Sequence, residues 1–63
     1  MRSPNDIKFN CTHDHQLYLS IYICNGDAES AIMYAAEQGW MIRGLDYQTA
    51  ITMMNNVKER YND

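Results

Sequence analysis

The residues from 17 to 24 constrain the fold of this chain more than any other stretch. Every odd position holds Leu or Ile, and the even positions hold Tyr, Ser or Cys. Such an alternation in β-favouring residues is typical of a strand that buries one face and exposes the other. The pattern therefore predicts a core strand over residues 17–24.

A shorter alternation precedes it and predicts a first strand over residues 7–12, with Ile7, Phe9 and Cys11 on its apolar side. Both apolar sets occupy odd positions. If the two sets share a buried face, the numbers of any two residues that pair across the strands must add up to an even number. A hairpin with a three-residue loop at 14–16, or with a longer loop of the same parity, meets this condition.

After residue 24, apolar residues recur at helical spacing in two segments. Asp27 is the expected N-cap of a first helix that ends at Gly39 and has an alanine-rich buried flank. Asp46 is expected to cap a second helix that runs to about residue 60 or 61. The apolar stripe of this helix contains Tyr47, Ala50, Ile51, Met54, Val57 and Tyr61. Between the helices, the apolar residues 39–45 are bounded by glycines and predict a third strand.

These elements predict an α+β fold in which a small single-layer, three-stranded, mostly antiparallel sheet carries two helices on one face (ββαβα). Residues 1–5 are expected to form a flexible N-terminal arm, and residues 6–63 a single α+β domain. Strand order 2-1-3 and strand order 1-2-3 with a right-handed crossover both remain open. In the first order, the strand at 17–24 lies at a sheet edge that invites a partner strand.

Composition narrows the function classes. A chain of 63 residues is near the lower limit for folding unaided. The net charge is −3 and the five basic residues are scattered, which disfavours a phosphate-binding stripe and favours a basic patch on another protein. The sequence has neither a long apolar run nor a recognisable signal segment, so we expect a cytoplasmic protein that does not enter membranes.

The residue types that could support chemistry are Cys11, His13, Asp14, His15 and Cys24. On the predicted sheet the two cysteines point to opposite faces, so they are not expected to share a metal or a disulfide. The histidines and Asp14 would lie at a hairpin tip, where turn chemistry alone accounts for them. We therefore expect no catalytic residues, no metal site and no cofactor.

The predicted outer sheet face and the outer flank of the first helix are the expected contact surfaces. Tyrosine is enriched at protein interfaces, and methionine suits adaptable contacts. The candidate partner-binding residues are Lys8, Tyr18, Ser20, Tyr22, Met33, Tyr34 and Arg43.

These features favour a non-catalytic protein-interaction domain that acts as an inhibitor, adaptor or regulator by binding a larger protein. Small acidic proteins of this kind are frequent among phage and mobile-element products that target host machinery. One alternative is a nucleic-acid-binding domain that stacks bases on Tyr18 and Tyr22, with Lys8 and Arg43 beside them. Another is a structural homodimer joined through an edge strand or the second helix.

Overall fold

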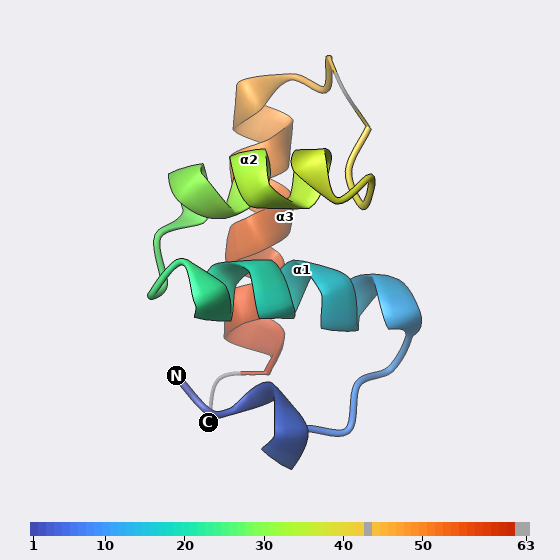
Figure 1. Cartoon of the computed structure of the whole chain (residues 1–63), viewed down its shortest axis with the longest axis vertical. Coiled ribbons are helices and arrows are strands. Elements are labelled where there is room, and N and C mark those ends of the chain that lie inside the picture. Colours follow the sequence, from blue (N-terminus) through green and yellow to red (C-terminus); the bar gives the residue numbers. More distant parts are fainter. Residues whose placement is uncertain (43, 62–63) are drawn as a thin grey trace.

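The computed structural model describes residues 1–42 and 44–61, and the only regular structure in these ranges is helical (Figure 1). The elements are a short 3₁₀ helix, η1 (Pro4–Asp6), and the helices α1 (Thr12–Ile23), α2 (Ala28–Glu37) and α3 (Tyr47–Arg60). The predicted α+β fold with a three-stranded sheet is therefore wrong. Both strand orders and the predicted sheet edge are wrong with it.

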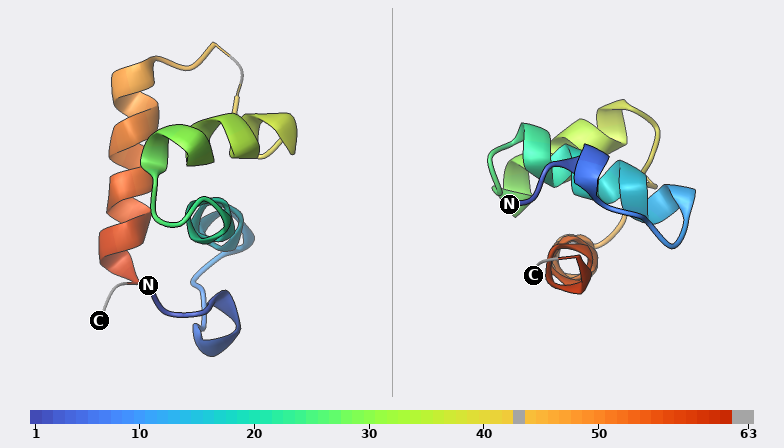
Figure 2. Two further views of the ribbon diagram at one scale, coloured as in Figure 1. Left: turned by 60° about the vertical axis from the view of Figure 1, so that its left-hand side comes forward. Right: turned by 90° about the horizontal axis from the view of Figure 1, so that it is seen from below.

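The helices form two layers. α1 and α2 lie side by side, joined by a tight turn, and α3 crosses both of them on one side (Figures 1 and 2). Within the described ranges, no helix has the length and apolar character needed to cross a membrane.

The stretch predicted as the core strand forms most of α1. Leu17, Tyr18, Ser20 and Ile21 are all buried, because α2 and α3 both pack against α1 and together cover a wide arc of its surface. The polar side chains at the two buried even positions have partners: the Tyr18 hydroxyl donates to the Arg2 carbonyl at 2.7 Å, and Ser20 Oγ donates to the Gln16 carbonyl at 2.9 Å. A helix also satisfies its own backbone groups, whereas a strand needs a neighbouring strand.

The segment predicted as the first strand is an irregular connection between η1 and α1. Ile7 and Phe9 pack against the core, and the Phe9 ring contacts those of Tyr18 and Tyr61 at centroid distances of 5.4 and 4.9 Å. Cys11, predicted to be buried, is exposed. The predicted arm 1–5 contains the start of η1, where Pro4 is buried. These contacts place the N-terminal segment against α1.

The two predicted helices are confirmed. The Asp27 carboxylate caps α2 by accepting from the Glu29 N–H at 3.1 Å, and Gly39 follows α2 with φ of +79°. Asp46 caps α3 by accepting from the Thr49 N–H at 3.2 Å. The buried stripe of α3 consists of Ala50, Met54 and Val57, and Tyr61 continues it just beyond the helix. Tyr47, which was predicted in this stripe, is exposed.

The predicted third strand, residues 39–45, is wrong in the part that the structure describes. Gly39 and Gly44 both adopt left-handed conformations that turn the chain. Met41 is buried in the core, and Trp40 packs against Tyr34 at a centroid distance of 6.0 Å. Trp40, Met41 and Leu45 therefore pack on the core without pairing with another strand, whereas Ile42 is exposed.

The packing of α2 against the core uses small side chains. Ala35 is fully buried, so we expect Ala35→Leu to overpack this contact and lower the free energy of unfolding by about 1–3 kcal/mol. The control is Met33→Leu on the exposed side of the same helix, which should change stability by less than about 0.5 kcal/mol. Urea unfolding followed by circular dichroism measures both. Equal stability of the two variants would contradict the packing described.

Candidate functional site

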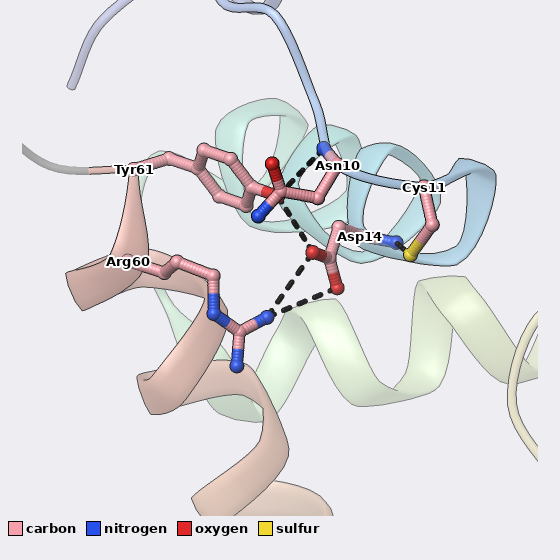
Figure 3. A network of polar contacts seen from close by, with 5 residues as sticks. All are labelled: Asn10, Cys11, Asp14, Arg60 and Tyr61. Carbon is pink, nitrogen blue, oxygen red and sulfur yellow. Dashed lines mark hydrogen bonds and ion pairs between the residues drawn. The ribbon is translucent and has the colours of Figure 1, made fainter.

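The carboxylate of Asp14, in the first turn of α1, is buried and accepts hydrogen bonds from two other side chains. It is 8 % exposed and accepts a hydrogen bond from the Tyr61 hydroxyl at 2.6 Å (Figure 3). The guanidinium of Arg60 donates to both carboxylate oxygens, each at 3.1 Å. These contacts join the start of α1 to the end of α3.

The same network continues into the N-terminal segment. The Tyr61 hydroxyl accepts a hydrogen bond from the Asn10 N–H at 3.0 Å, and Cys11 Sγ accepts from the Asp14 N–H at 3.5 Å. The hydrogen bond from Tyr61 lowers the pKa of Asp14 despite the opposing effect of burial, and Arg60 lowers it further. Burial and the Asp14 carboxylate raise the pKa of Tyr61. The network holds three segments together and so has a structural role.

The sequence His13–Asp14–His15 occupies the first turn of α1 and not a hairpin tip. The His15 ring stacks on Phe9 with a centroid distance of 4.7 Å, while Asp14 faces the end of α3. His13 lines a hollow of ≈ 160 Å³ between α1 and α3, together with Asp14 and Arg60. Each of these side chains therefore has a different environment.

The two cysteines are at opposite ends of α1. Cys11 is the N-cap and Cys24 the C-cap, and both thiols are free. At 1.5 Å per residue, the thirteen-residue separation places them about 20 Å apart. We expected the two cysteines to stay apart because of the predicted sheet geometry, which is wrong. They are apart because the whole of α1 lies between them. Among the described residues, no group of three His, Cys, Asp or Glu side chains could hold a metal ion.

The structure separates the predicted partner-binding residues. Tyr18 and Ser20 are only 1 % and 0 % exposed, so neither side chain is available to a partner. Lys8 and Tyr22 are exposed, and Tyr22 lines a cavity of ≈ 350 Å³ with Met1 and Asn25.

The other predicted residues lie in or near α2. Met33 is exposed, whereas Tyr34 is partly covered and contacts Trp40. Arg43 lies outside the described residues. Of the predicted set, Met33 therefore lies on an exposed helix surface in the way that the sequence predicted.

A surface that sequence reasoning missed surrounds Met33. Glu29, Met33 and Glu37 follow one another at four-residue spacing along α2, so they lie on one side of the helix, and all three are exposed. Tyr47, at the start of α3, extends this surface because its hydroxyl lies beside the Glu29 carboxylate. Partial desolvation and this carboxylate raise the pKa of Tyr47. We call these four residues the acidic face.

The signal for the acidic face was present in the sequence. Residues 27–49 contain four acidic residues and one basic residue, whereas acidic and basic residues are equal in number in the rest of the chain. The whole net charge of −3 therefore falls in this third of the sequence. Helical spacing then indicates which of these side chains share one side of α2.

The interior network makes a prediction about stability. Tyr61→Phe keeps the aromatic contacts but removes the donor to Asp14 and the acceptor for Asn10, so we expect Tm to fall by about 5–10 °C. Tyr22→Phe is the matched control, because Tyr22 is exposed, and it should leave Tm nearly unchanged. Thermal unfolding followed by circular dichroism provides the test. A Tm for Tyr61→Phe equal to that of the control would refute this role.

Asp14 also makes stability depend on pH. Its pKa in the folded state is lower than the ordinary value of 3.8, so its contribution is fully present above that value and is lost as pH falls through the lower, folded pKa. We expect the stability difference between the natural protein and Asp14→Asn to shrink in acid below about pH 3.8. Urea titrations of both proteins across this range measure the difference. A constant difference would exclude the ionised carboxylate as its source.

Comparison with known proteins found no matching family model, no matching curated protein and no matching solved structure.

Proposed function

We propose that this chain is a non-catalytic protein-binding domain that acts by occupying a surface of a larger protein with the outer side of α2. An inhibitor, adaptor or regulator would work in this way, including one of the phage or mobile-element kind that targets host machinery. The contact centre in this proposal is Met33, with the rest of the acidic face around it.

The observation that supports the proposal is where the exposed apolar side chains lie. The three most exposed large apolar residues in the described part of the chain are Ile42, Met33 and Tyr47, at 78, 68 and 56 %. All three belong to α2, the following connection or the first residue of α3. Single exposed apolar residues are ordinary. The support for the proposal is that the three most exposed ones all fall within residues 33–47.

The helix that carries Met33 is held in a defined position. Asp27 caps its first turn, and Ser30 Oγ donates to the Asp27 carboxylate at 2.9 Å. On its inner side, Ala31 and Ala35 are fully buried against the core. A surface held in this way loses little conformational entropy when a partner binds, which favours affinity.

The alternatives drawn from the sequence rested on surfaces that the described residues do not form. A base-stacking platform required Tyr18 on an open sheet, but its ring is buried and its hydroxyl is bonded to the Arg2 carbonyl. A dimer through an edge strand has no strand to use in the described residues. Of the apolar stripe of α3, Ala50, Met54 and Val57 are buried within the domain itself. The protein-binding proposal instead uses side chains that are exposed.

The proposal is tested by comparing two exposed positions. The natural chain, Met33→Asp and Tyr22→Asp are immobilised and exposed to an extract of the source cell. We expect a stoichiometric partner that binds the natural chain and Tyr22→Asp, with affinity for Met33→Asp reduced about tenfold or more. Circular dichroism verifies that all three proteins are folded.

Two results would contradict this proposal. One is the absence of any stoichiometric partner. The other is a partner that Met33→Asp binds as tightly as the natural chain does, since binding would then use another part of the molecule.

A further inference from the structure

We infer that the partner presents a basic surface to the acidic face, with two cationic groups about 12 Å apart and an apolar side chain between them. This inference rests on the proposed function and adds the chemistry of the partner. The spacing follows from α2, where Glu29 and Glu37 are eight residues apart with Met33 midway.

The distribution of charge supports a cationic partner. The acidic residues of the region 27–49 are Asp27, Glu29, Glu37 and Asp46, and the single basic residue there is Arg43. α2 and the start of α3 lie in the half of the molecule away from the N-terminus and the end of α3 (Figure 1). Charge of one sign gathered at one end attracts and orients a partner of the opposite sign.

The four carboxylates of this region have two kinds of role. Asp27 and Asp46 are the N-caps of α2 and α3, so each accepts a backbone hydrogen bond. Glu29 and Glu37 cap neither helix, and they flank Met33 on the exposed side of α2. Their charges are therefore the ones that an approaching surface can neutralise without unwinding a helix end.

A second copy of this chain fits the acidic face poorly. Two copies carry the same net charge of −3, so they repel each other. Two of the basic side chains already have internal partners: Lys58 Nζ donates to the Gly26 carbonyl at 3.2 Å, and Arg60 binds Asp14. Nucleic acids and anionic membranes are repelled for the same electrostatic reason. A basic protein surface remains as the occupant.

The two parts of the surface should contribute differently to binding. Exposed charges at the rim of an interface mainly raise the association rate and make it sensitive to salt. A buried apolar contact mainly slows dissociation. We therefore expect Glu29 and Glu37 to govern the salt dependence of association, and Met33 to govern the lifetime of the complex.

The test uses a displayed library of random helical peptides, selected on the immobilised natural chain. We expect the enriched peptides to carry Lys or Arg on both sides of a large apolar residue. Glu29→Lys/Glu37→Lys should bind these peptides about tenfold more weakly at low salt. The matched control is Asp6→Lys/Glu59→Lys, which changes net charge equally at two exposed residues away from the acidic face and should retain most of the binding.

The outcomes separate this inference from the proposed function. If Met33→Asp abolishes peptide binding but Glu29→Lys/Glu37→Lys does not, the protein-binding surface stands and the basic partner is refuted. Equal losses in the two charge-reversed proteins would show that only bulk charge matters, which also overturns the inference. A selection that enriches no basic sequence overturns it as well. If neither Met33→Asp nor Glu29→Lys/Glu37→Lys weakens binding, both proposals fail.

Discussion

The fold depends on one buried carboxylate, that of Asp14. A charge removed from water is costly unless it is paired, and here the Tyr61 hydroxyl at 2.6 Å and the Arg60 guanidinium supply the partners. Because the Tyr61 hydroxyl also accepts from the Asn10 N–H, this one cluster joins the N-terminal segment, the start of α1 and the end of α3. A domain of this size has a small core, and such a cluster adds specific contacts between the first and last parts of the chain.

Two groups of polar side chains have different roles in this molecule. Those at the Asp14 end bind one another, and Lys58 binds the Gly26 carbonyl in the α1–α2 turn. Those along the outer side of α2 remain exposed around Met33. This separation is the physical basis of the proposed function, because carboxylates already used inside the fold are not available to a partner.

Local signals predicted part of the fold and of the site. Asp27 and Asp46 marked the helix starts, and Gly39 marked the end of α2, because capping depends on residues adjacent in sequence. Met33 was predicted as an exposed contact, yet its neighbours Glu29 and Glu37 were missed although their spacing was visible. Tyr18 was placed on an open face and is buried, because its exposure depended on a sheet that the described residues do not form.

The sequence by itself determined the two capped helices, most of the residues that they bury, and the concentration of negative charge in residues 27–49. Tertiary structure decided the conformation of residues 17–24, whose alternation suits a strand. With α2 and α3 covering two sides of this segment, a helix buries Leu17, Tyr18, Ser20 and Ile21 together and satisfies its own backbone. A periodic pattern of apolar residues indicates a single buried face. It therefore could not reveal a helix that is covered on two sides.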